Sequence, residues 1–371
     1  MTQQTARRHS QPATSKSTAG QRPVPTLLPT SVVGSYALPS WFWTALEAIK
    51  EGVYGRTDAR ETFDDAVGLA VRDQERAGID IITDGEMRRW YFVQGFYSHF
   101  PGLEPREPLR KVGIDGYDSP PRYRPVERIG VPNGLGIVEE FEHSRRQTEH
   151  ALKMTCPGPL TLTIHVQTRR GDVYDGDRLA LAYDVAGAIN RELHALADAG
   201  ATFIQLDEPS YSIIPGEAKE WVDLYNTAVK GVREKGVKLG LHVCFGNLGS
   251  RPRGKRTYRW MFPDLLDTDN DEIVLEFANR EMRELDLLGE IAQDRVVGAG
   301  LVDVKSFYVE TPEDVAERLR EALEHCPPEK MTVVPDCGFF QLPRWLAFQK
   351  LHRLVQGVEI VRQELTGEKG S

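Results

Sequence analysis

The sequence is poor in cysteine, in long apolar runs and in positive charge, and each shortage excludes a class of protein. Only four cysteines occur among 371 residues, without the regular spacing of a disulfide-stapled secreted domain. No apolar run approaches the length that crosses a bilayer. The formal net charge is −9, whereas nucleic-acid-binding domains are typically basic. We therefore expect a cytoplasmic protein that acts on small molecules and binds neither nucleic acid nor membrane.

Residues 1–28 are predicted to form a disordered tail. They are rich in Ser, Thr, Gln and Arg and lack the apolar segment of a secretory signal. Their lack of acidic residues would also suit a transit peptide, but Pro12, Gly20 and Pro23 interrupt any amphipathic helix. The folded part is then expected to span residues 29–371.

Within this folded part, short β-rich runs alternate with longer helical stretches, which is typical of repeated βα units and a parallel sheet. Helix signals between them are clear: the apolar repeat over 178–199 ends at Gly200, and Thr311 with Pro312 opens another helix. The β-rich runs are residues 31–36, 79–86, 153–162, 202–211, 238–244, 272–279, 296–306 and 331–337. Eight such runs predict an α/β fold, a closed (β/α)8 TIM barrel.

One stretch interrupts this alternation after the second run. Residues 90–150 are too rich in Pro, Gly and Arg for a single crossover helix. In barrels such insertions emerge from βα loops and commonly cover the active site. We expect a lid or substrate wall here. The alternative is a dimerisation arm, which would make the protein a homo-oligomer.

Four residues with side chains that bind metals lie at or just past the ends of separate predicted strands. His242 and Cys244 share one face of a strand because side chains alternate along it. Glu276 and Cys337 end two further runs, and Cys337 lies in a Pro-Asp-Cys-Gly turn. A buried cysteine often acts only as a small apolar residue, but thiolate and imidazole together favour zinc. We predict a Zn²⁺ site of His242, Cys244, Glu276 and Cys337.

Other polar residues collect at the same predicted strand ends. Ser35 closes the first run, Glu86 the second and Asp207 the fourth, and Lys305 lies near the end of the seventh. The Asp84–Glu86 and Asp207–Pro209 segments could also be simple turns. As functional groups, Glu86 and Asp207 could hold an ammonium group or transfer a proton. A thiolate-rich zinc site suits activation of a substrate thiol better than hydrolysis.

Taken in order, these motifs resemble the catalytic barrel of the cobalamin-independent methionine synthases over residues 30 to about 345. The segments that carry the resemblance are VGSY, GIDIITDGE, IQLDEPSY, LHVC, LEFANR and PDCGF. The resemblance implies the zinc ligands named above and a homocysteine site, with Ser35 at the carboxylate and Glu86 and Asp207 at the amino group. It implies methyl transfer to the zinc-held thiolate of homocysteine from a methyl-folate or a methylcobalamin carrier.

The sequence departs from this family at Lys305, which stands in GLVDVKS where the family motif has a histidine that assists proton delivery. A lysine could instead neutralise an anionic substrate. We predict Asp207 and Lys305 as the catalytic residues. Two alternatives stay open: opening of an epoxide by a zinc-activated thiol such as coenzyme M, and a non-enzymatic zinc- or corrinoid-binding partner.

Overall fold

The computed structural model describes residues 22–89, 92–109, 119–247 and 255–367. The helices are α1 (Ser40–Lys50), α2 (Arg56–Ala77), α3 (Ile137–Ser144), α4 (Arg178–Ala199), α5 (Ala218–Val229), α6 (Asp286–Ala292), α7 (Pro312–Leu323) and α8 (Arg344–Thr366). The strands are β1 (Ile81–Ile82), β2 (Leu103–Arg106), β3 (Arg122–Pro125), β4 (Ala151–Leu152), β5 (Met154–Pro157), β6 (Phe203–Asp207), β7 (Lys238–Val243), β8 (Glu272–Glu276), β9 (Val296–Val302) and β10 (Met331–Pro335). In this part of the chain no helix is long and apolar enough to cross a membrane.

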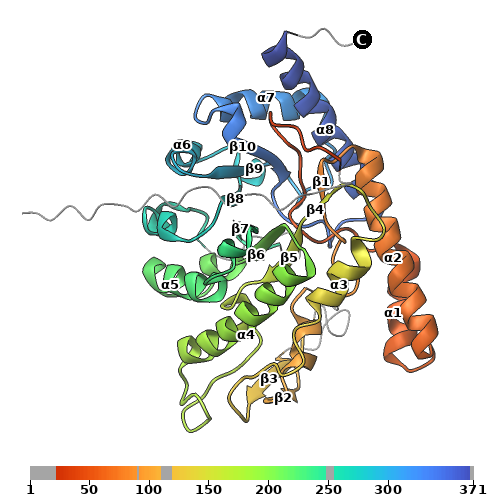
Figure 1. Cartoon of the computed structure of the whole chain (residues 1–371), viewed down its shortest axis with the longest axis vertical. Coiled ribbons are helices and arrows are strands. Elements are labelled where there is room, and N and C mark those ends of the chain that lie inside the picture. Colours follow the sequence, from red (N-terminus) through yellow and green to blue (C-terminus); the bar gives the residue numbers. More distant parts are fainter. Residues whose placement is uncertain (1–21, 90–91, 110–118, 248–254, 368–371) are drawn as a thin grey trace, which may run out of the picture.

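Apart from β2 and β3, the strands form a parallel ring with helices outside it, as Figure 1 shows. Six of them pair in the order β10-β9-β8-β7-β6-β5, and β1 pairs with β4. Thr30 forms a parallel bridge with Val333 of β10, and Ser31 forms one with Ile81 of β1. The backbone N–H of Lys153 donates to the carbonyl oxygen of Ile82 at 2.8 Å, which joins β1 to the β5 side. These contacts close the predicted (β/α)8 TIM barrel.

The predicted β-rich runs are longer than the strands that form. The first run contributes only the bridge at Ser31, and the second contributes only Ile81 and Ile82. The helix predictions are confirmed: α4 ends at Gly200, whose φ of 104° is left-handed, and the Thr311 side chain caps α7 by accepting from the N–H of Asp314.

Residues 22–28, the part of the predicted tail that the structure describes, lie against the barrel. The N–H of Arg22 donates to the carbonyl oxygen of Glu149 at 2.7 Å. Leu28 is buried, and the Arg362 guanidinium donates to its carbonyl oxygen at 3.0 Å. The core therefore begins at Leu28, one residue before the predicted boundary, and residues 1–21 lie outside the described residues.

The insertion at 90–150 folds into local elements of its own. A 3-10 helix (Gln94–His99) leads into the antiparallel β2–β3 hairpin, and α3 follows. The hairpin lies at one end of the molecule in Figure 1, away from the strand ring. Residues 90–91 and 110–118 of the insertion lie outside the described residues.

Candidate active site

A cavity of about 280 Å³ opens at the carboxyl ends of the barrel strands. Its wall includes part of the insertion, from Phe92 to Gln94 and at Pro120 and Arg122. Six of the predicted site residues line it: Ser35, Glu86, Asp207, His242, Cys244 and Cys337. Tertiary structure has thus brought together residues as distant in the chain as Ser35 and Cys337.

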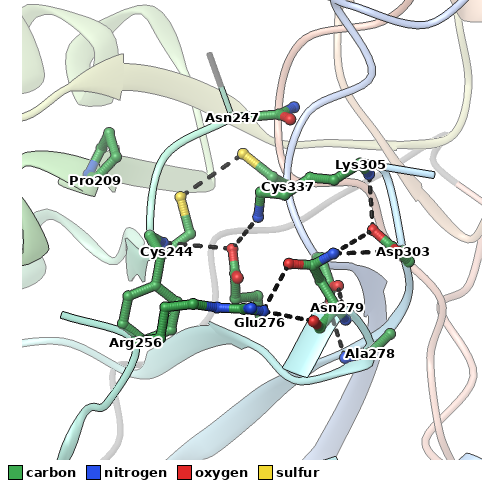
Figure 2. A network of polar contacts seen from close by, with 12 residues as sticks. Pro209, Cys244, Asn247, Arg256, Glu276, Ala278, Asn279, Asp303, Lys305 and Cys337 are labelled. Atoms are coloured by element: carbon green, nitrogen blue, oxygen red, sulfur yellow. Dashed lines mark hydrogen bonds and ion pairs between the residues drawn. The ribbon is translucent and has the colours of Figure 1, made fainter. Parts of the chain in front are cut away.

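His242, Cys244 and Cys337 form a cluster that could hold a metal ion, with donor atoms that all lie within 4.8 Å of one another. The two sulfur atoms face each other at 3.7 Å, as Figure 2 shows. Two thiolates at about 2.3 Å from one tetrahedral zinc lie about 3.8 Å apart. The observed sulfur separation therefore fits zinc, and the donor set is the soft one that zinc prefers.

The ring of His242 is oriented by Asp207. Its Nδ1 lies 2.9 Å from Oδ1 of Asp207, and its Nε2 is buried with no hydrogen-bond partner among the described residues. Metal-binding histidines commonly donate their other ring N–H to a carboxylate, which fixes the tautomer. With Nδ1 directed at Asp207, Nε2 is the nitrogen left to bind a metal.

The three donors shift one another's pKa values. The pKa of Cys337 lies well below its ordinary value because the Cys244 thiol and the nearby His242 ring stabilise its thiolate, although burial opposes this. The same contact with Cys337, together with burial, raises the pKa of Cys244 well above its ordinary value. Burial opposes protonation of His242, but the neighbouring Asp207 carboxylate and the nearby Cys337 sulfur raise its pKa to about 10. The surroundings of Cys337 therefore favour the thiolate, which is the form that binds a cation.

Glu276, the predicted fourth ligand, lies beside this cluster and is not one of its three members. Its Oε2 contacts the Nζ of Lys305 at 2.5 Å and accepts from the N–H of Phe245 at 3.3 Å. Its Oε1 is buried and has no hydrogen-bond partner among the described residues. Figure 2 shows the carboxylate between Cys244 and Lys305. One oxygen is thus available, and ligation by Glu276 stays a prediction.

Lys305 was predicted to be catalytic, and the structure places it behind Glu276 and outside the cavity lining. Only 9% of this residue is exposed. Burial opposes its charge, but the carboxylate of Glu276 raises the pKa of Lys305 above its ordinary value. Its direct contact is therefore with a predicted metal ligand, and its catalytic role stays a prediction.

Glu86 reaches the cavity from a tight turn. Its N–H donates to Oδ1 of Asp84 at 2.9 Å, and Gly85 and Glu86 both have positive φ angles, of 71° and 57°. The Thr155 hydroxyl donates to Oε1 of Glu86 at 2.7 Å, and Arg89 lies 3.4 Å from the same oxygen. Burial raises the pKa of Glu86 to about 7, although Arg89 opposes the rise. The segment is therefore the tight turn that the sequence allows, and it places Glu86 on the cavity wall, where its functional role stays a prediction.

The two acidic residues of the Asp207-Glu208-Pro209 segment have different surroundings. Asp207 lines the cavity, and its Oδ2 is buried without a hydrogen-bond partner among the described residues. Glu208 instead accepts from the N–H groups of Leu160 and Thr161, at 2.9 and 3.1 Å. Glu208 therefore holds the loop after β5, and of the two acidic residues only Asp207 lines the cavity.

Sequence reasoning missed several residues that support the site. Asp336 accepts from the N–H groups of residues 277, 278 and 279, directly after Glu276. Arg89 binds Glu140 of α3 at 2.8 Å, which ties the insertion to the Glu86 turn. Gln205 donates to Asp207 at 2.8 Å. Only Gln205 had a signal in the sequence, because it shares a strand face with Asp207 two positions later.

This geometry agrees with the comparison of the sequence with known proteins. Residues 28–359 match the family model described as the catalytic domain of cobalamin-independent synthase. The chain belongs to the cobalamin-independent methionine synthase family. Among relatives in this family, the methionine synthase of Sulfurisphaera tokodaii is 36% identical over 341 residues, which cover 91% of this chain and 94% of the relative. That of Thermococcus kodakarensis is 36% identical over 344 residues, covering 92% and 96%.

A solved structure of the family is also similar. The B12-independent methionine synthase of Shewanella sp. W3-18-1, in complex with selenomethionine, superposes with a TM-score of 0.77 and 29% sequence identity. The match covers 92% of this chain and all of that one. Membership in this family implies an enzyme that transfers methyl groups. It does not favour the epoxide-opening alternative or the non-enzymatic binding partner.

Proposed function

We propose that this protein is a zinc-dependent methyltransferase that transfers a methyl group to the thiol of homocysteine. The observation that carries the proposal is the shared cavity: a His-Cys-Cys cluster and the side chains of Ser35, Glu86 and Asp207 line the same space. A metal cluster alone would suit many reactions. The adjacent carboxylates and hydroxyl add recognition of an amino acid.

The proposed zinc ligands are Nε2 of His242, the sulfur atoms of Cys244 and Cys337, and Oε1 of Glu276. Two of these atoms, Nε2 and Oε1, are buried without other hydrogen-bond partners in the described chain, and a bound cation would satisfy both. Zinc bound here would supply Lewis acidity, which lowers the pKa of a thiol that approaches it. Lys305 would neutralise the second oxygen of Glu276.

The amino-acid part of homocysteine fits the polar side of the cavity. Its ammonium group would lie between Glu86 and the unpartnered Oδ2 of Asp207, where a charge-assisted hydrogen bond forms in buried surroundings. Ser35 would donate its hydroxyl to the substrate carboxylate. Such an arrangement directs the thiol of the substrate toward the cysteine cluster, and orientation of this kind lowers the barrier to transfer.

The second substrate is proposed to be a methyl-folate or a methylcobalamin carrier. The family assignment supports a methyl donor in general and leaves its identity to experiment. Methionine formed from homocysteine would be measured with each donor in turn. The cytoplasmic location and a homo-oligomeric state stay predictions.

Metal-free protein loaded with Co²⁺ tests the acceptor and the metal together, because sulfur ligands to cobalt give intense bands in the visible spectrum. We expect a further sulfur-to-cobalt band with homocysteine and none with coenzyme M. A Cys156→Ser variant is the matched control, since Cys156 is buried but outside the cluster. A new band with coenzyme M alone would favour epoxide opening. No change with either thiol would remove the main support for the proposal.

A further inference from the structure

A fully buried lysine lies below the site, inside the barrel. Lys153 stands between β4 and β5, and its side chain is 0% exposed. Its Nζ donates to Oε1 of Gln205 at 2.7 Å and to the carbonyl oxygen of Val32 at 2.5 Å. No described carboxylate lies within ion-pair distance of it. A buried charge without a counter-ion costs several kcal/mol, so a role beyond core packing is expected.

The lysine determines which way the amide of Gln205 points. An ammonium group can only donate hydrogen bonds, so the amide oxygen of Gln205 must face Lys153. The Nε2 of Gln205 then donates to the carbonyl oxygen of Val33 and to Oδ1 of Asp207, both at 2.8 Å. The reversed amide would place NH₂ against the ammonium and an oxygen against the Asp207 carboxylate. Both contacts would be repulsive.

This amide direction determines the two atoms that Asp207 and His242 present to the cavity. Oδ1 of Asp207 receives Gln205 and lies 2.9 Å from Nδ1 of His242. Because Oδ1 is used twice, Oδ2 is the oxygen left for the substrate. Because Nδ1 is engaged, Nε2 is the nitrogen left for the metal. Burial lowers the pKa of Lys153 to about 8, so the ammonium keeps its proton at neutral pH.

We propose that Lys153 is a positioning residue that acts through Gln205 to hold Asp207 and His242 in the orientation needed for metal and substrate. The inference rests on the proposed function, since it assumes that His242 binds zinc. Lys153 itself does not line the cavity. Of its two hydrogen bonds, the one to Gln205 leads to Asp207 and His242, and the one to Val32 does not contact either residue.

The series of contacts from Lys153 through Gln205 to Asp207 and His242 can be tested by measuring zinc affinity against a chromophoric chelator. Four proteins are compared: wild type, Lys153→Met, Gln205→Leu and the double variant. We expect each single variant to bind zinc about 10- to 100-fold more weakly, as loss of supporting contacts around a metal site usually does. The double variant should bind no more weakly than either single one, because both remove the same chain of contacts. Losses that add would indicate two separate packing effects and overturn the proposal.

Lys350→Met is the matched control. Lys350 is also 0% exposed, and it pairs with Glu310 away from Gln205 and Asp207. We expect this variant to lose stability and keep its zinc affinity. An equal loss of zinc affinity in both lysine variants would show a general effect of destabilisation and overturn the proposal.

Gln205→Glu provides a second route if Lys153→Met does not fold. A glutamate at this position can still pair with Lys153 but cannot donate to Asp207. We expect weaker zinc and homocysteine binding in a folded protein, and unchanged binding of both would contradict the assigned amide direction. The wild-type measurement separates the two proposals. Wild type without zinc affinity would remove the proposed function, whereas equal affinity in wild type and Lys153→Met would remove this inference alone.

Discussion

Replacing Gly34 by alanine would test whether the position of Glu86 determines substrate binding. A Cβ at residue 34 would lie 2.5 Å from Oε1 of Glu86 and 3.3 Å from the methyl group of Thr155. Ordinary contacts of a Cβ begin at 3.4 Å, so the carboxylate oxygen must retreat by about 0.9 Å. The same oxygen accepts the 2.7 Å hydrogen bond from Thr155. The substitution therefore displaces the carboxylate from its only short hydrogen bond among the described contacts.

A misplacement of about 1 Å in a binding group can lower catalytic efficiency by about 100-fold. We therefore expect kcat/KM for homocysteine to fall by about 100-fold in Gly34→Ala, which corresponds to about 2.7 kcal/mol of transition-state stabilisation. Overpacking should also lower the free energy of unfolding by about 1–3 kcal/mol. Zinc affinity should not change, since no predicted ligand is displaced.

The assay is steady-state methylation of homocysteine, with zinc content and chemical denaturation measured on the same preparations. Gly130→Ala is the matched control, because a Cβ at residue 130 would have no heavy atom within 4 Å. That variant should behave like wild type in every measurement. A Gly34→Ala protein with wild-type kcat/KM would refute the reasoning, because it would show that the Glu86 carboxylate can move without consequence.

Three further predictions follow from the same site. Cys337→Ser should lose tightly bound zinc and methyl transfer, whereas Cys156→Ser keeps both, and retention of both by Cys337→Ser would exclude Cys337 as a ligand. Burial raises the pKa of Glu86 to about 7, so its carboxylate loses its charge below that pH. Thus kcat/KM for homocysteine should rise as the pH increases through about 7, and Glu86→Gln should remove this limb of the profile. Lys305→Met leaves the buried Glu276 carboxylate unpaired, which should lower the stability of the metal-free protein by about 3–5 kcal/mol. Zinc should restore part of that loss in a denaturant titration, and unchanged metal-free stability would contradict the ion pair.

Much of the fold was predictable because its signals are local. The apolar repeat of α4, its stop at Gly200 and the capping box of α7 depend on residues within a few positions of one another. Alternating βα units predict a barrel by the same local logic. The strand ends were less predictable, since a β-rich run such as 79–86 continues past the two residues that pair.

The candidate ligands were also visible in the sequence, because a strand places alternate side chains on one face. This alternation predicts that His242 and Cys244 share one face of their strand. The same alternation places Gln205 on one strand face with Asp207. The alignment of separate strand ends at one mouth is a general property of a barrel. The sequence by itself therefore determined which residue types reach the cavity.

Tertiary structure alone decided how these residues are used. The pairing of Lys305 with Glu276, the contact of Arg89 with Glu140 and the path from Lys153 to Asp207 join segments that no local pattern connects. The register between neighbouring strands sets which polar atoms lie within 3 Å of each other. Hydrogen bonding and charge pairing depend on those short distances. The closed barrel therefore determines the partners of each site residue, and the local sequence pattern does not.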